Sequence, residues 1–170
     1  AAESVMFNLG INASGRINFN TADGTASFGL ANLLPSNLGK ALVIDQYNTN
    51  QEGVKRTGTW YLSEAKSLSS GIFDGQWRCA GRGADSNNIT VTGASVKAKN
   101  LSTGSTLDGV FKYNQAPTAS GLQDLAGFIA GGASTDALSD YDWFLPLSST
   151  MGIDYMPNDN KVRVCYKTSN

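Results

Sequence analysis

The chain has 170 residues, of which 41% are hydrophobic and 16% are charged, and its formal net charge is −1. Typical globular proteins carry about 25% charged residues, so neutral polar side chains supply most of this surface. The near-zero charge provides no electrostatic footprint for binding nucleic acid or an anionic membrane. The sequence contains no histidine, which removes the commonest general base and the commonest neutral metal ligand. Length and uniform composition together predict one domain over residues 1–170.

The N-terminus and the two cysteines point to an exported protein. The chain begins with Ala1-Ala2-Glu3-Ser4, the kind of small-residue start that follows cleavage at an A-x-A-like site. No run approaches the ~18 apolar residues that span a bilayer, so we expect no membrane insertion. Cys79 and Cys165 are the only cysteines, and without histidine or a C-x-x-C spacing they do not make a zinc site. We expect a Cys79–Cys165 disulfide and no metal; two unpaired core thiols in a cytosolic protein are the alternative.

The first third of the chain contains three predicted strands. Val5, Phe7, Leu9 and Ile11 alternate with residues of the opposite face, and this period of two continues to residue 19, which predicts a strand over 5–19. An Asp-Gly turn follows at 21–24. The apolar run 41–44 predicts a buried strand, and 55–62 is rich in strand formers. The polar residues 48–53 between these two strands predict a loop.

The rest of the chain is also predicted to be mostly β. We expect strands over 71–79, 89–92, 94–98, 108–113 and 161–167, with a loop at 85–88 and a turn at 157–160. Residues 120–129 differ, because apolar side chains recur at 122, 125, 126 and 129 with helical spacing. A second helical turn is expected within 134–140. Several short strands with regular turns favour a sandwich or a barrel, and of these we expect an all-β, immunoglobulin-like or jelly-roll sandwich with short helical insertions.

Aromatic residues beside polar groups are the main candidates for a binding site. They occur as Trp60-Tyr61, Trp77-Arg78 and Tyr141-Asp142-Trp143. Sugars are bound by stacking of their C–H faces on aromatic rings while planar polar side chains hold the hydroxyls. Core packing is the alternative, because tryptophan is highly buried on average, and we expect it for Trp77. The predicted ligand-binding residues are Trp143, Asp140, Asp142, Trp60, Tyr61 and Arg78.

Asp140 and Asp142 form the one pair of carboxylates that suggests chemistry. They flank Tyr141, and in an extended segment residues two apart project to the same face. Such a pair can bind sugar hydroxyls or Ca²⁺, or act as acid and base in a small secreted glycan hydrolase. The alternative is a loop of solvated acids. No other catalytic group stands out, so we expect a protein that is not an enzyme and needs no cofactor.

The first twenty residues resemble the start of a bacterial chaperone–usher fimbrial subunit. The likeness rests on Ala1-Ala2-Glu3-Ser4, the alternating run 5–11 and Gly15-Arg16-Ile17-Asn18-Phe19. It implies that the N-terminal strand completes the immunoglobulin-like fold of a neighbouring subunit by strand addition, with a periplasmic chaperone as a further partner. The chain departs from this family, because pilins usually place a cysteine soon after the first strand and because residues 162–170 lack the usual ending. A tip-adhesin domain cut before its pilin domain accounts for that C-terminus.

Taken together, these features predict non-catalytic adhesion at a bacterial surface, as part of a fimbrium. The expected partner is a host-cell glycan or glycoprotein receptor, and no nucleic acid is expected. A second hypothesis is a polymerising pilus subunit that donates Val5, Phe7, Leu9 and Ile11 as a strand. The hydrolase that would use Asp140 and Asp142 is the third.

Overall fold

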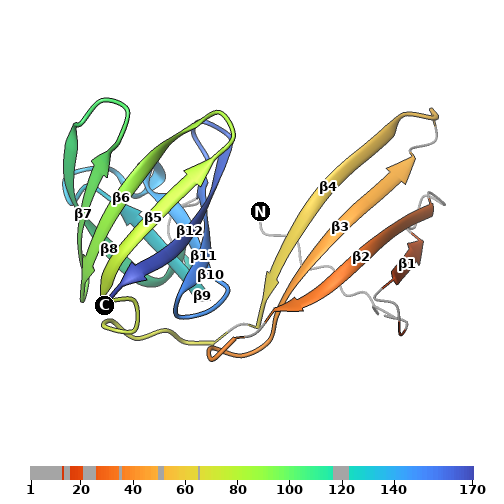
Figure 1. Ribbon diagram of the computed structural model, residues 1–170, viewed down its shortest axis with the longest axis horizontal. Coiled ribbons are helices and arrows are strands. Elements are labelled where there is room, and N and C mark those ends of the chain that lie inside the picture. The colour runs from red at the N-terminus through yellow and green to blue at the C-terminus, as the bar shows by residue number, and fades with distance from the viewer. Residues whose placement is uncertain are drawn as a thin grey trace. The chain divides into compact units, whose positions relative to one another are not determined.

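The computed structural model describes residues 13, 16–20, 26–34, 36–49, 52–64, 66–116 and 123–170. Over these residues the chain forms twelve strands and one short 3-10 helix, Leu138–Asp140, which confirms the all-β class. Contacts divide the chain into two compact units, Ala1–Pro35 with Lys40–Leu62, and Ser36–Gly39 with Ser63–Asn170; Figure 1 labels the strands of both. The single domain over 1–170 stays a prediction. None of the described residues belongs to a helix long and apolar enough to cross a membrane.

The first unit is a four-stranded antiparallel sheet. Its strands lie in chain order and are β1 (Arg16–Asn20), β2 (Ala26–Leu34), β3 (Ala41–Thr49) and β4 (Lys55–Ser63). β3 and β4 confirm the strands predicted over 41–44 and 55–62, and β1 confirms the end of the strand predicted over 5–19. β3 runs to Thr49, so the expected loop begins later than residue 48. Residues 5–11, with the proposed donor side chains, and the turn at 21–24 lie outside the described residues.

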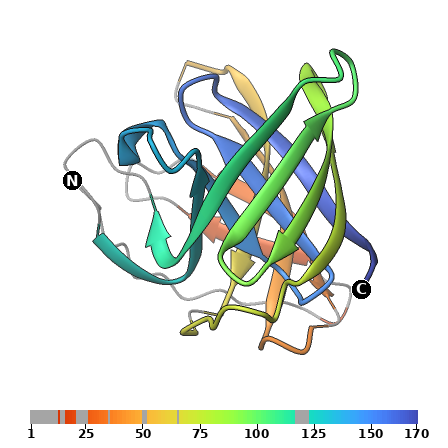
Figure 2. The ribbon, with the colours of Figure 1, turned by 90° about the vertical axis from the view of Figure 1, so that its left-hand side faces the viewer.

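The second unit is a closed barrel of eight antiparallel strands. Each strand pairs with the next in the chain, and the last strand pairs with the first, as Figure 2 shows with the barrel facing the viewer. This closure replaces the expected immunoglobulin-like or jelly-roll sandwich, because a sheet that closes on itself has no edges and needs no second sheet. The strands are β5 (Gly75–Gly81), β6 (Ala84–Thr92), β7 (Ser95–Asn100), β8 (Thr106–Ala116), β9 (Gln123–Gly132), β10 (Asp142–Pro146), β11 (Met151–Met156) and β12 (Lys161–Ser169).

The helix predicted over 120–129 is wrong, because the described part of this segment belongs to strand β9. β9 pairs with β8 on one side and with β10 on the other. Gly127 has a φ of 89°, which is incompatible with a right-handed helix. A register shift in the pairing of β8 with β9 lies between Tyr113 and Gln115. Such irregularities disturb the strict alternation of a strand, and an apolar spacing of three and four residues then resembles a helix.

The loop predicted at 85–88 is also wrong, because these polar residues lie within β6. β6 pairs with β5 and with β7, and Asn88 is opposite Arg78 and Lys99. Asn87 and Asn88 are paired with strands on both sides. In the segment 134–140, the helical turn is limited to Leu138–Asp140.

The Cys79–Cys165 disulfide is confirmed. The two cysteines lie directly opposite each other on β5 and β12, and their side chains are 1% and 2% exposed inside the barrel. β5 and β12 are the first and last strands of the barrel. The disulfide therefore joins the two strands whose pairing closes it.

Aromatic side chains fill one end of the barrel beside the disulfide. Phe73 and Trp77 both meet the ring of Phe144 edge to face, at centroid distances of 6.1 and 5.8 Å. The indole Nε1 of Trp77 donates a hydrogen bond to the carbonyl of Phe73 at 2.8 Å. Trp77 is buried, which confirms it as a core residue.

Loss of the disulfide should destabilise the barrel strongly, because 86 residues separate the two cysteines. In the chain-entropy model, a loop of that length corresponds to about 4–5 kcal/mol of unfolding free energy. We expect reduction, and the double variant Cys79→Ala/Cys165→Ala, to lower the urea midpoint to a similar extent. The check is urea unfolding with and without reductant. An unchanged midpoint in the double variant would contradict a stabilising role for this disulfide.

Candidate ligand-binding site

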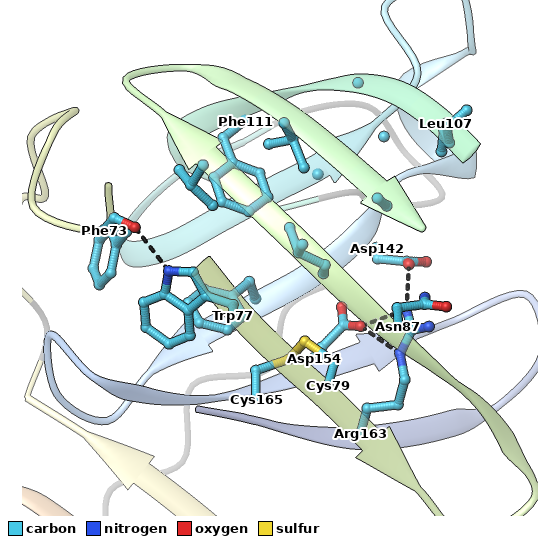
Figure 3. A pocket seen from close by; sticks show the side chains of 18 residues that line it. Phe73, Trp77, Cys79, Asn87, Leu107, Phe111, Asp142, Asp154, Arg163 and Cys165 are labelled. Carbon is cyan, nitrogen blue, oxygen red and sulfur yellow. Dashed lines mark hydrogen bonds and ion pairs between the residues drawn. A yellow bond between two sulfur atoms is a disulfide. The ribbon is translucent and has the colours of Figure 1, made fainter. Parts of the chain in front are cut away.

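The barrel encloses a half-open cavity of about 160 Å³. Figure 3 shows aromatic side chains on one side of it and a cluster of charged and amide side chains on the other. The disulfide lies between these two ends, since Cys79 follows Trp77 by two residues on β5 and Cys165 follows Arg163 by two on β12. The residues that line the cavity include Trp77, Asn87, Ala98, Phe111, Gly131, Asp142, Phe144, Asp154 and Arg163.

Two glycines leave room for the aromatic wall of the cavity. A side chain at Gly131 would place its Cβ 2.9 Å from the ring of Phe111, and one at Gly109 would lie 2.7 Å from the carbonyl oxygen of Gly132. The ring of Phe111 lies parallel to that of Phe144, with centroids 6.2 Å apart. The small residues therefore let β8 and β9 approach closely while large rings occupy the interior.

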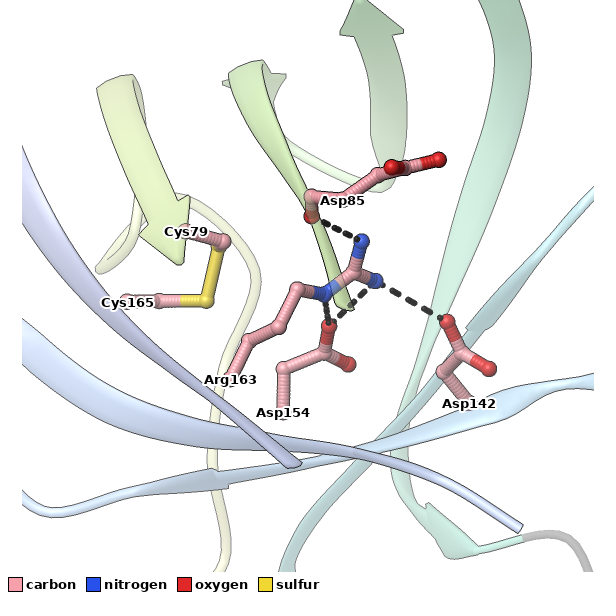
Figure 4. The surroundings of a disulfide bond; sticks show 6 residues. All are labelled: Cys79, Asp85, Asp142, Asp154, Arg163 and Cys165. Atoms are coloured by element: carbon pink, nitrogen blue, oxygen red, sulfur yellow. Dashed lines mark hydrogen bonds and ion pairs between the residues drawn. A yellow bond between two sulfur atoms is a disulfide. The ribbon is translucent and has the colours of Figure 1, made fainter. Parts of the chain in front are cut away.

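Arg163 is the centre of the polar end, as Figure 4 shows. Its Nε and Nη2 both reach Oδ2 of Asp154, at 2.8 and 2.6 Å, and Nη2 also reaches Oδ2 of Asp142 at 3.4 Å. Nη1 donates to the carbonyl of Asp85 at 3.5 Å. The amide of Asn87, oriented so that its NH₂ donates to the Ser86 carbonyl, accepts a further hydrogen bond from Nη1. Each of the three nitrogens of the guanidinium therefore has at least one acceptor.

The two carboxylates differ in their exposure to solvent. The side chain of Asp154 is 10% exposed, whereas that of Asp142 is 37% exposed. Burial first, and then the nearby charge of Asp154, raise the pKa of Asp142 to about 7 against the opposing charge of Arg163. Burial also raises the pKa of Asp154, although Arg163 opposes that change. Two carboxylates thus share one guanidinium, so a negative charge on the second carboxylate is unfavourable.

The structure separates the two carboxylates that the sequence suggested as a pair. Asp142 is the first residue of β10 and lines the cavity. Asp140 ends the 3-10 helix, is exposed, and accepts a long hydrogen bond of 3.5 Å from Ser139 Oγ. The carboxylate that shares the guanidinium with Asp142 is Asp154, from β11.

The predicted aromatic residues do not meet at this site. Trp143 points to the opposite face of β10 from Asp142 and Phe144, and its ring packs edge to face between Phe128 and Tyr155. Its Nε1 is buried without a hydrogen-bond partner among the described residues. Trp60, which is 43% exposed, and Tyr61 lie on β4 in the other compact unit.

Arg78 belongs to a second, shallower hollow on the outer face of the barrel. Its Nη1 donates to Oδ1 of Asn88 at 3.3 Å across β5 and β6. Tyr166 on β12, opposite Arg78 in the register, is 50% exposed. The other side chains that line this hollow include Gln76, Asn88 and Thr168.

Sequence patterns missed Arg163 and Asp154. On β12, Val162, Val164 and Tyr166 are exposed, while Arg163 and Cys165 face the interior. The sequence signal for the inward position of Arg163 is Cys165, two residues further along the strand. A disulfide buried between two strands turns residues 163 and 165 inward together, because side chains two apart share a face. Asp154 is opposite Arg163 in the register of β11 with β12.

Comparison of the chain with protein-family models, with curated proteins and with solved structures finds no match.

The raised pKa of Asp142 predicts a pH-dependent stability. Between its ordinary value of 3.8 and about 7, the folded protein binds a proton that the unfolded chain has lost, so this contribution to stability is lost as the pH rises. We expect Asp142→Asn, which keeps an acceptor for Arg163 without the charge, to gain stability relative to the wild type from about pH 5 to about pH 8. Solvent screening at this partly exposed side chain reduces the size of the gain.

Urea unfolding at the two pH values measures this difference. The matched control is Asp140→Asn, at an exposed carboxylate two residues away, which should follow the wild type at both. If the difference in stability between Asp142→Asn and the wild type were the same at both pH values, the expectation would be contradicted.

Proposed function

We propose that this protein is a non-catalytic binding protein whose barrel holds one small, mainly apolar ligand. The supporting observation is the half-open cavity of about 160 Å³ inside a closed eight-stranded barrel. A barrel of eight strands is wide enough either to be filled by its side chains or to hold one small ligand. A dry engineered cavity of about 150 Å³ binds benzene. The cavity therefore fits a ligand built on a single ring.

The lining of the cavity supports a binding role. Aromatic walls from Trp77, Phe111 and Phe144 stand opposite one compact polar group. A concave, largely apolar site with a few convergent polar groups is the usual form of a small-molecule site. The aromatic rings supply contact area, and the polar end orients the ligand.

Filling the cavity should abolish binding. Ala98 on β7 lines the cavity, and Ala98→Leu would extend a side chain into the space of the ligand. We expect the affinity for toluene, followed by ligand-observed NMR, to fall by about tenfold or more, because the ligand loses its contacts with the wall. The matched control is Ala80→Leu, the same change at an exposed position of β5, which should bind toluene like the wild type. Absence of toluene binding to the wild type, or equal binding by Ala98→Leu, would contradict a binding cavity.

Glycan adhesion at a bacterial surface is the second candidate function, and the outer hollow of β5, β6 and β12 favours it. The half-exposed ring of Tyr166 lies beside the guanidinium and amide groups of Arg78, Asn88 and Gln76. An aromatic face next to planar polar groups is the combination expected for sugar binding. Trp143, Trp60 and Tyr61 do not line this hollow. The fimbrial location, the chaperone partner and the strand donation by residues 5–11 remain proposals that rest on the N-terminal resemblance.

A glycan array tests the second candidate. We expect Tyr166→Ala and Arg78→Ala each to abolish the signals that the wild-type protein gives, because stacking and hydrogen bonding to the sugar are lost. Val164→Ala is the control, since Val164 is exposed on β12 but does not line the hollow. A wild-type array without signals, or signals retained by both variants, would exclude this surface as the glycan site.

A further inference from the structure

We infer that the ligand of the barrel is a small organic cation, an apolar ring that carries an ammonium group, with the ammonium at Asp142 and Asp154. This inference rests on the proposed binding function of the cavity. It concerns the charge and the hydrogen-bonding character of the ligand, which the polar end of the cavity determines.

The balance of charge in the cavity favours a cationic ligand. One guanidinium, that of Arg163, lies between the carboxylates of Asp142 and Asp154. Among the described residues that line this cavity, Arg163 is the one basic residue. An anionic ligand would add negative charge where two carboxylates already share one guanidinium, whereas a cation would give each carboxylate a positive partner.

The hydrogen-bonding capacity that remains in the polar end also favours a cation. All three nitrogens of the Arg163 guanidinium are engaged, by Asp154, Asp142, Asp85 and Asn87. Both aspartates contact Arg163 through Oδ2, and among the interactions of the described residues Oδ1 of each accepts none. A ligand that reaches this end therefore meets acceptors rather than donors. It must supply N–H or O–H groups, as an ammonium does with its three donors.

The position of Asp142 suits a ligand that carries its charge at one end. Its side chain is 37% exposed while that of Asp154 is 10% exposed, so Asp142 lies toward solvent and Asp154 deeper. A ligand can thus bury its ring against Phe111, Phe144 and Trp77 while its ammonium keeps some contact with water, which limits the cost of desolvating the charge. A bare divalent metal ion fits less well, because the guanidinium lies between the two carboxylates and would repel it.

Four ligands of similar size and different charge test the inference on the full chain. They are benzylamine, benzyl alcohol, toluene and benzoate, titrated near neutral pH and followed by NMR. We expect benzylamine to bind about tenfold more tightly than benzyl alcohol, and benzoate to bind most weakly. We expect Asp142→Asn to reduce the preference for benzylamine over benzyl alcohol to about twofold or less, because the paired charge is gone. Asp140→Asn, at an exposed carboxylate outside the cavity, should keep the wild-type preference.

The outcomes separate the inference from the function on which it rests. Binding of toluene and benzyl alcohol with no preference for benzylamine would overturn the cation and leave the binding cavity in place. Benzoate binding as tightly as benzylamine, or an unchanged preference in Asp142→Asn, would also overturn it. If none of the four ligands binds, the proposed binding function itself fails. The comparison among the four ligands uses the wild-type protein, so it does not depend on the folding of any variant.

Discussion

The pairing of β12 with β5 is the constraint on which the second unit depends. These strands are separated by most of that unit's sequence, yet their register places Cys79 opposite Cys165, and the disulfide holds them together. Once they pair, every strand of the barrel has two neighbours and no sheet edge is left open. Closure also turns one face of each strand toward a common interior, and both the aromatic core and the cavity are built there.

The interior combines two environments that are costly to place together. One end is lined by buried aromatic side chains, whereas the other end holds a buried arginine with two carboxylates. A buried charge is tolerated only when it is paired and hydrogen-bonded, and the four acceptors around Arg163 meet that condition. Because those acceptors come from β6, β10 and β11, the group also connects β6 with three strands, β10, β11 and β12, that do not pair with it. In the same network, oxygens of the two carboxylates face the cavity. The charged group that connects the strands can therefore also recognise a ligand.

Most strands were predictable because their local patterns agree with their environments. The alternation of residues 94–98 and the β-branched and aromatic residues of 55–62 are examples. Residues 120–129 were predicted as a helix, because Gly127 and the irregular pairing of β8 with β9 disturb the alternation that identifies a strand. Of the candidate site, Asp142 was predicted without its partners, since Asp154 and Arg163 come from strands that only the barrel brings beside it. Arg78 was predicted together with Trp77, and these neighbours on β5 face opposite sides of the barrel wall.

The sequence by itself determined the all-β class, the disulfide and the burial of Trp77, because strand propensity, cysteine content and residue size are local properties. The tertiary structure decided that the second unit is a barrel and not a sandwich, since that choice depends on which strands pair across long stretches of chain. It also decided which face of β12 is internal. Hydrophobic alternation alone would turn Val162, Val164 and Tyr166 inward, but the pairing of Cys165 with Cys79 turns Arg163 inward instead. If the alternate residues of β12 faced inward instead, the interior would be apolar and would lack the charged group.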